Sequence, residues 1–286
     1  PGPDGFTGIF FKKCWGIIKD DIMRVIHLFE NLHGANLHWL NSANVVLLPK
    51  KGAECISDYR PISLIHGIAK IIAKVMSNRL APRMNDLVSQ AQSAFIKRRC
   101  IHDNFLLVPQ TAKHLHNRKI PRVLLKLDIA RAFDTVSWAF LLDVLHHLGF
   151  GRRWIEWIAI LLSTSSTRVL INGSPGPPIA HACGLRQGDP VSPMLFTIAI
   201  DALNSLLLHA HRSGLLQRLT TRQASSSISF YADDVIIFCH PDRSELSAIN
   251  SLLDRFGTAS GLRTNFAKCL AAPIQCSDDS ASSVSA

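Results

Sequence analysis

The 286-residue sequence has seven cysteines but no two of them at C-x-x-C spacing. Their odd number, their scattered positions and the lack of a signal peptide predict reduced thiols in an intracellular protein, which excludes a disulfide scaffold. The thirteen histidines include closely spaced pairs, but none has a cysteine partner at zinc-ligand spacing. We therefore expect surface or groove histidines and no zinc site.

The sequence also has no internal repeat with a period of 20–50 residues, which argues against a solenoid or propeller. Its longest apolar stretch, 191–209, contains Asp201 and Asn204, so we interpret it as a buried helix and expect no membrane partner. The chain begins with Pro1 and not with Met, so we expect it to be a fragment or to have lost upstream sequence. Residues 277–286 form a Ser/Ala/Asp tail without apolar periodicity, and we expect this tail to be disordered.

Positive charge dominates: the sequence has 31 Lys and Arg against 21 Asp and Glu, which gives a net charge of +10 and a pI of about 9.5. A basic excess favours a polyanionic partner and salt-dependent binding. The basic clusters are Lys97-Arg98-Arg99, Arg118-Lys119 with Arg122, and Arg152-Arg153. Each cluster alone is typical of a solvated face; beside a phosphate-handling site they would form a nucleic-acid track.

Two adjacent acids, Asp233 and Asp234, lie between the apolar, β-prone runs 227–230 and 235–239. This pattern predicts a hairpin with the acids at its turn. Neighbouring carboxylates repel one another unless a cation lies between them. Hard oxygen ligands at a sharp turn suit Mg²⁺. Taken alone, such a segment is more often an ordinary hairpin turn that contains aspartate, and the metal-site interpretation depends on the rest of the chain.

A third acid, Asp128, ends the mostly apolar run 123–129, which predicts a buried strand. Residues 137–148 follow with helical periodicity and Ser137 as a candidate N-cap. Asp128 alone could simply cap a turn. Together with Asp233 and Asp234 it makes three acids at strand ends, a set that can hold two metal ions for phosphoryl transfer.

A glycine-rich loop, residues 184–190, is the third element of this pattern. Asp189 and Pro190 predict a helix start, with an acidic N-cap and proline at the first helical position. Gly184 and Gly188 would let the backbone approach a ligand closely, and Gln187 offers both a donor and an acceptor. An ordinary helix entry needs neither the glycines nor the glutamine.

Residues 126–136, 184–193 and 231–234 together resemble the A, B and C motifs of reverse transcriptases. The resemblance is closest to the non-LTR (LINE-type) retrotransposon enzymes, especially those abundant in plant genomes. Residues 48–51, 58–64 and 92–99, with Asp103-Asn104, are similar to that family's fingers motifs, and 261–269 to its motif D. The resemblance extends from Pro1 to about Cys276.

The resemblance implies roles position by position. Asp128, Asp233 and Asp234 would bind metal together with the carbonyl of Ile129, and Phe133 would be the steric gate against the sugar. The other implied contacts are Lys50 and Arg60 to the triphosphate, Gln187 and Gly188 in the nucleotide and template pocket, and Lys268 as a proton donor near the pyrophosphate. Beside such a site, the basic clusters are expected to contact nucleic acid through Lys97, Arg98, Arg99, Arg118 and Lys119. The sequence departs from the family at Ala94 and Arg98, where glycines are usual, and at Cys269, where Ser or Thr is usual.

The expected fold is α+β: right-hand polymerase fingers and palm, with an antiparallel palm sheet backed by helices and the thumb absent. Residues 1–122 would form the fingers and N-terminal region and 123–276 the palm, with 138–182 partly returning to the fingers. Further expected elements are helices near 9–32, 68–80, 151–162 and 245–256 and strands at 44–48, 167–171 and 179–183.

The resemblance implies an RNA-directed DNA polymerase that adds dNTPs to a DNA primer on an RNA template. Its cofactor would be Mg²⁺, with Mn²⁺ as an alternative, and its location the nucleus and cytoplasm. One rival is an RNA-dependent RNA polymerase, against which the bulky Phe133 argues. The other is an inactive relic that binds nucleic acid; the intact acids argue against it, and the missing thumb and flanking regions argue for it. Without a thumb, we expect extension to stop after a few nucleotides at physiological salt.

Overall fold

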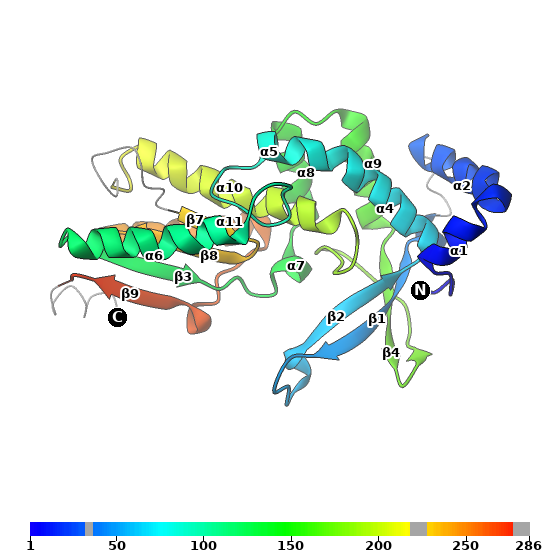
Figure 1. Cartoon of the computed structure of the whole chain (residues 1–286), viewed down its shortest axis with the longest axis horizontal. Coiled ribbons are helices and arrows are strands. Elements are labelled where there is room, and N and C mark those ends of the chain that lie inside the picture. Colours follow the sequence, from blue (N-terminus) through cyan, green and yellow to red (C-terminus); the bar gives the residue numbers. More distant parts are fainter. Residues whose placement is uncertain (32–36, 218–227, 277–286) are drawn as a thin grey trace. The chain divides into compact units, whose positions relative to one another are not determined.

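The chain folds into two compact units, each formed by two separate stretches of sequence (Figure 1). Unit 1 comprises Pro1–Leu80 and Leu141–Leu195, and unit 2 comprises Ala81–Phe140 and Phe196–Ala286. The structure is a computed structural model that describes residues 1–31, 37–217 and 228–276. The predicted tail 277–286 lies outside the described residues. The assignment of fingers and palm to residue ranges stays a prediction.

Both units contain helices and strands, as expected for an α+β chain. Unit 1 contains α1 (Gly8–Lys13), α2 (Trp15–Glu30), α3 (Leu37–Leu40), β1 (Ser42–Pro49), η1 (Ile56–Asp58), β2 (Tyr59–Ile65), α4 (Gly67–Leu80), α9 (Arg152–Ser163), β4 (Ser166–Ile171), β5 (Ser174–Pro175) and β6 (Ile179–Ala180). Unit 2 contains η2 (Ala81–Arg83), α5 (Met84–Leu87), α6 (Ile101–Asn117), β3 (Arg122–Leu127), α7 (Ala132–Thr135), β7 (Ile228–Tyr231), β8 (Asp234–Cys239), α11 (Arg243–Ser260), η3 (Phe266–Lys268) and β9 (Leu270–Ile274). Helices α8 (Trp138–His147) and α10 (Ser192–Arg212) have residues in both units.

Unit 1 is organised around the long hairpin of β1 and β2. The two strands pair antiparallel from Ala43↔Ile65 to Pro49↔Tyr59, and β4 joins β1 in parallel. Alternate residues of β1 are buried, as a period of two requires. Ala43 and Ile65 pack with Ala69 of α4 in a small core cluster. The hairpin base is thus anchored in the core, whereas Lys50 and Arg60, near its tip, are exposed.

Unit 2 contains a fully antiparallel sheet with the strand order β7-β8-β3-β9. Pairing of Leu127 with Val235 and of Tyr231 with Asp234 sets its register. One face carries Val123, Leu127, Val235 and Ile237, all at most 4% exposed. Apolar residues on this face recur at every second position, so a shift of one residue would expose them all.

Helix α6 covers the other face of this sheet, and Figure 1 shows it lying along the strands. Leu115 and Ala112 of α6 pack against Leu124 of β3, Phe238 of β8 and Ile274 of β9. The antiparallel sheet backed by helices, as expected from the sequence, is confirmed. It was predicted without α6, because Pro109 lies inside that helix and interrupts the sequence pattern.

Several other predicted elements need correction at their boundaries. The expected helix 9–32 is two helices, because the backbone leaves helical geometry at Cys14 (ψ 6°). The strand expected at 179–183 has only two residues, and the helix expected at 245–256 extends over Arg243–Ser260. The helix expected to start at Asp189-Pro190 begins at Ser192. Strand β9 was not predicted.

Helix α10 is the one described helix that is long and apolar enough to cross a membrane by length and composition. Of its most apolar window, 61% is buried inside the protein. Phe196, Ile200, Leu203 and Leu207 are fully buried, and Asp201 accepts two hydrogen bonds from Ser89 of the same unit. These contacts are those of a core helix.

Gly261 ends α11 in the left-handed region (φ 79°), and a Cβ there would lie 2.0 Å from the carbonyl oxygen of Thr135. We predict that Gly261→Ala lowers the unfolding free energy by about 2–5 kcal/mol, because it combines backbone strain with overpacking. Gly214→Ala is the matched control: its φ is 76° but no atom lies within 4 Å, so it should cost only about 1–2 kcal/mol. Equal losses in denaturant unfolding would contradict the role of the close approach.

Candidate active site

The three predicted acids meet at one end of the unit 2 sheet. Asp128 directly follows the last residue of β3, and Asp234 is the first residue of β8. Because Leu127 pairs with Val235, the next step of the register brings Asp128 alongside Asp234. Asp233 lies in the two-residue turn that connects β7 with β8. Residues more than a hundred positions apart are thus gathered by strand pairing alone.

The charges of two neighbouring carboxylates affect the pKa of Asp233. Its pKa is raised above the ordinary value, first by desolvation among the surrounding atoms and then by the charges of Asp234 and Asp128. Its own backbone N–H opposes this effect. Asp233 as a residue is nevertheless exposed, so it stays accessible to a ligand. Three carboxylates at one end of a sheet form a place where a cation would be stabilised.

The carboxylates are not drawn together around a single point. Within the described ranges, no three His, Cys, Asp or Glu side chains form a group that could hold a metal ion as they stand. Asp234 instead lies 3.8 Å from the Nζ atom of Lys126, in a pair with both partners more than half exposed. Such an exposed pair contributes little free energy. The donor set itself, carboxylate oxygens at the end of a sheet, suits a hard divalent cation.

The segment around Lys268 lies against Asp128. The Asn265 N–H donates to the Asp128 carbonyl at 2.8 Å, and the Asp128 N–H donates to Sγ of Cys269 at 3.4 Å. Next to them, Ile129 forms an isolated bridge with Thr264. These bonds fix the backbone of Asp128 and Ile129 and bring the exposed Lys268, in η3, to the same edge of the sheet. Cys269, where Ser or Thr is usual, thus takes part in the hydrogen bonding of this edge.

Phe133 lies in α7, a single helical turn that begins after Arg131 in the left-handed region (φ 49°). Its ring stacks on Phe196 of α10, with centroids 4.5 Å apart and planes at 17°. Stacking on a fully buried partner fixes the direction of the ring. Phe133 is only half-buried, so part of the residue remains accessible.

In unit 1, the glycine-rich loop is held against β2. The Ser63 N–H donates to the Gln187 carbonyl at 2.9 Å, and a Cβ at Gly188 (φ 108°) would lie 2.8 Å from the Ser63 carbonyl oxygen. Gly188 is therefore required because the loop backbone lies so close to the backbone of β2. The sequence had predicted a close approach to a ligand instead. The amide of Gln187 remains half-exposed.

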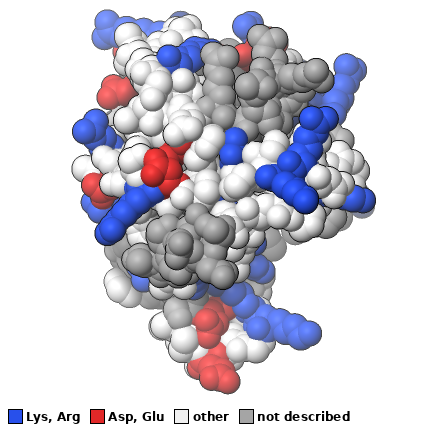
Figure 2. Space-filling model, turned by 90° about the vertical axis from the view of Figure 1, so that its left-hand side faces the viewer, with Lys and Arg blue, Asp and Glu red and all other residues white. Residues whose placement is uncertain are grey.

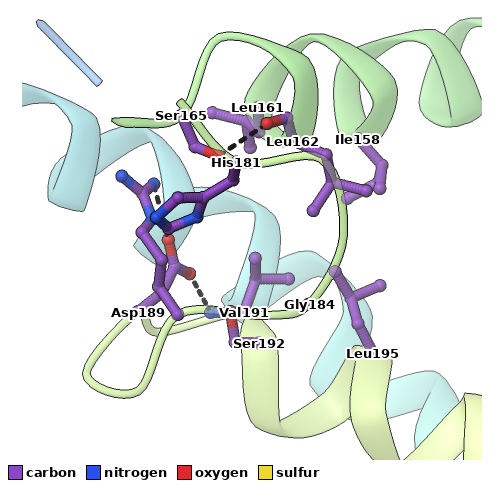
Figure 3. Close-up of a pocket in the computed structure, with 11 residues that line it drawn as sticks. Ile158, Leu161, Leu162, Ser165, His181, Gly184, Asp189, Val191, Ser192 and Leu195 are labelled. Carbon is purple, nitrogen blue, oxygen red and sulfur yellow. Dashed lines mark hydrogen bonds and ion pairs between the residues drawn. The ribbon is translucent and has the colours of Figure 1, made fainter. Parts of the chain in front are cut away.

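Asp189 has a different role from the predicted helix cap (Figure 3). It is 7% exposed and pairs with Arg186 at 3.3 Å, and its other oxygen accepts from the Val191 N–H at 2.9 Å. Arg186 also donates to the Asn41 carbonyl at 2.9 Å. Nearby, burial and the charge of Arg186 lower the pKa of His181. The acid therefore supports the loop before the helix and neutralises a buried arginine.

The predicted nucleic-acid contacts fall into two groups within unit 2. Lys97 and Arg98 precede α6, and Arg118 and Lys119 follow it; all four are exposed. The 17 residues of α6 make it about 25 Å long, so the groups flank a helix and do not form one patch. On the face drawn in Figure 2, Lys and Arg side chains are scattered and form no single stripe.

Arg99 has a structural task that the sequence did not reveal. Its guanidinium donates to the carbonyls of Gln92 (2.7 Å), Val88 (3.0 Å) and Asn85 (3.2 Å) and also to that of Ser89. Burial lowers the pKa of this guanidinium. Its N–H groups are thus occupied by oxygens of α5 and of the loop between α5 and α6. Gln92 lies in the same loop. The sequence analysis included it only as part of a motif, and its hydrogen bonds were not predicted either.

We predict that Asp233→Asn stabilises the metal-free protein at neutral pH. A carboxyl whose folded-state pKa is raised favours folding below its unfolded pKa, and this stability is lost as the pH rises through the folded pKa. The wild type should therefore match the variant near pH 3.5 and have the lower melting temperature at pH 7. Excess divalent cation should reduce the difference. Melting curves with equal differences at both pH values would contradict this assignment.

Comparison with known proteins identifies the family of the chain. A family model described as reverse transcriptase (RNA-dependent DNA polymerase) matches residues 48–277. The transposon TX1 uncharacterized 149 kDa protein of Xenopus laevis is 32% identical over 94% of the chain and 20% of its own length. The Pol polyprotein of retrotransposable element R2DM of Drosophila melanogaster is 27% identical over 96% of the chain and 25% of its own length.

The fold is also found among solved structures. Apo telomerase from Candida tropicalis, truncated from its C-terminal domain, has a TM-score of 0.56 at 11% identity, covering 84% of this chain and 51% of that one. At this identity the likeness shows the fold alone. The chain spans a fifth to a quarter of the two curated relatives, both of which come from mobile elements. By the family match over most of its length, the chain belongs to the reverse transcriptase (RNA-dependent DNA polymerase) family.

Proposed function

We propose that this chain is the catalytic part of a retrotransposon RNA-directed DNA polymerase. The observation that carries the proposal is the register of β3 and β8, which brings strand-end Asp128 beside Asp233 and Asp234. The reaction joins a primer 3′-hydroxyl to the α-phosphorus of a dNTP. The new P–O bond forms as the bond to the β-phosphate breaks, and pyrophosphate leaves.

Asp128, Asp233 and Asp234, together with the Ile129 carbonyl, would hold two divalent cations, for which we propose Mg²⁺ with Mn²⁺ as an alternative. When bound, such ions lower the pKa of the attacking hydroxyl and neutralise charge on the leaving group. The protein's own contribution is positioning. Hydrogen bonds from Asn265 and to Cys269 fix the backbone of Asp128, so its carboxylate is oriented before substrate arrives.

The remaining roles follow from the family resemblance. Lys268, on the edge that carries Asp128, would give a proton to the departing pyrophosphate. For unit 1 the motifs alone support the assignment of Arg60 and Lys50 to the triphosphate and of Gln187 and Gly188 to the nucleotide pocket. Lys97, Arg98, Arg118 and Lys119 are exposed cations suited to phosphates, and Arg99 would support their loop.

The finer assignments are an RNA template, a DNA primer, a plant-type LINE element as the source, and action in the nucleus and cytoplasm. The motif resemblance supports each of them. Primer extension tests the substrates most directly: RNA and DNA templates are compared, with dNTPs and NTPs in separate reactions. Extension on DNA template only, or with NTPs only, would contradict the proposed activity.

Replacing one metal ligand should abolish extension. We predict that Asp128→Asn or Asp233→Asn slows nucleotide addition by at least about 10³-fold, because charge stabilisation worth several kcal/mol is lost. Folding should persist, since a repelling charge is removed. Asp254→Asn, an exposed aspartate of α11, is the matched control and should extend like the wild type. An Asp233→Asn variant with normal extension would exclude this site.

Replacing Phe133 should relax sugar selection. We predict that Phe133→Val raises the relative use of NTPs over dNTPs by about tenfold or more, because the smaller side chain leaves room for a 2′-hydroxyl. Phe140→Val serves as control: it loses an edge contact with Phe256 and should lower stability without changing the ratio. Unchanged selectivity in Phe133→Val would mean that the ring serves only to pack on Phe196.

A further inference from the structure

A single buried side chain binds both backbone groups of the residue that precedes Asp233. Gln92 has no exposed surface. Its Oε1 atom accepts from the Ala232 N–H at 3.0 Å, and its Nε2 atom donates to the Ala232 carbonyl at 3.3 Å. Oε1 also accepts from the Ala94 N–H at 2.9 Å. The carboxamide therefore acts as donor and acceptor toward one residue of the turn.

Ala232 has an unfavourable backbone conformation. Its φ is 53°, in the left-handed region that alanine adopts only at a cost in free energy. It is the first residue of the two-residue turn between β7 and β8, and Asp233 is the second. Hairpin turns with positive φ at the first central position usually have glycine there. Some other interaction must hold alanine in this state.

Gln92 is itself held in a rigid frame. The Phe230 N–H donates to the Ala91 carbonyl at 2.8 Å, and the Ser93 N–H donates to the Phe230 carbonyl at 3.3 Å, so residues 91–93 lie along β7. Arg99 binds the Gln92 carbonyl. Asp201 of α10 accepts from the Ser89 N–H at 3.0 Å and from its hydroxyl. A helix, a loop and the turn are thereby connected.

We propose that Gln92 is a positioning residue: its carboxamide keeps Ala232 left-handed and so orients Asp233 toward the divalent cation. This inference rests on the proposed function. It explains why glutamine is suited to the position. A glutamate at the same place could only accept hydrogen bonds, and it would add a fourth negative charge near three others. An apolar residue would leave both groups of Ala232 without these bonds.

The test uses Gln92→Met, which keeps the volume, and Gln92→Glu, which keeps the two acceptor contacts. The control is Ser93→Ala, since the buried Ser93 hydroxyl has no hydrogen-bond partner among the described residues. Mn²⁺ affinity is measured by electron paramagnetic resonance, folding by thermal melting, and extension as a function of Mg²⁺ concentration. We expect both Gln92 variants to lose roughly 10- to 100-fold in Mn²⁺ affinity and to need correspondingly more Mg²⁺, with Ser93→Ala unchanged.

A second substitution separates positioning from general packing. Glycine adopts a positive φ without strain, so Ala232→Gly added to Gln92→Met should recover at least severalfold of the lost Mn²⁺ affinity. A packing defect at residue 92 would not respond to this change. Absence of recovery in a folded double variant would overturn the proposal.

Other outcomes are equally decisive. Gln92→Met that binds Mn²⁺ and extends primers like Ser93→Ala would overturn the inference while leaving the polymerase assignment intact. If Gln92→Met does not fold, Gln92→Glu decides by the same measurements; if neither folds, Gln92 serves the core and the proposal is wrong. A wild type that binds Mn²⁺ through Asp233 yet extends no primer would contradict the proposed function alone. The Mn²⁺ affinities of the variants would still decide whether Gln92 positions Asp233.

Discussion

Antiparallel pairing of β3 with β8 is the interaction on which the candidate site depends. It joins a strand near the middle of the chain to a hairpin more than a hundred residues later and brings their acidic ends together. The apolar face of these strands drives the pairing, because Val123, Leu127, Val235 and Ile237 are almost fully removed from water. The register that buries this face also fixes which residues lie at the sheet end. Stability and the location of the acids are therefore set by the same contacts.

Much of this site could be predicted from sequence because its parts are local. The hairpin at Asp233-Asp234, the strand before Asp128 and the helix after Ser137 each follow from short-range periodicity, and the structure confirms them. Helix α6 and strand β9 were missed. Pro109 interrupts the first. Strand β9 is short and has no fully buried residue, and its position is decided by pairing with β3. Tertiary contacts, not local propensity, decide such elements.

The polar support of the site could not be predicted for a related reason. Gln92 and Arg99 form hydrogen bonds with backbone groups. Every residue has such groups, so the sequence does not show which of them these side chains will bind. Aspartate is a favoured N-cap residue, so Asp189 was predicted to cap the helix. However, the buried Arg186 lies three positions before it. Because a buried charge without a partner is costly, pairing with Arg186 takes precedence over capping. Side chains with several possible partners are assigned by burial, which a single sequence does not disclose.

The phosphate contacts proposed for the exposed cations at the two ends of α6 would have a consequence for the length of duplex that can be held. At a rise of about 3.4 Å per base pair, the roughly 25 Å of this helix correspond to about seven base pairs. A duplex that reaches Lys97 and Arg98 as well as Arg118 and Lys119 must follow the helix for that distance. A hybrid of three or four pairs can engage only one end at a time. The length of α6 would thus set the shortest duplex that both groups of proposed contacts can hold together.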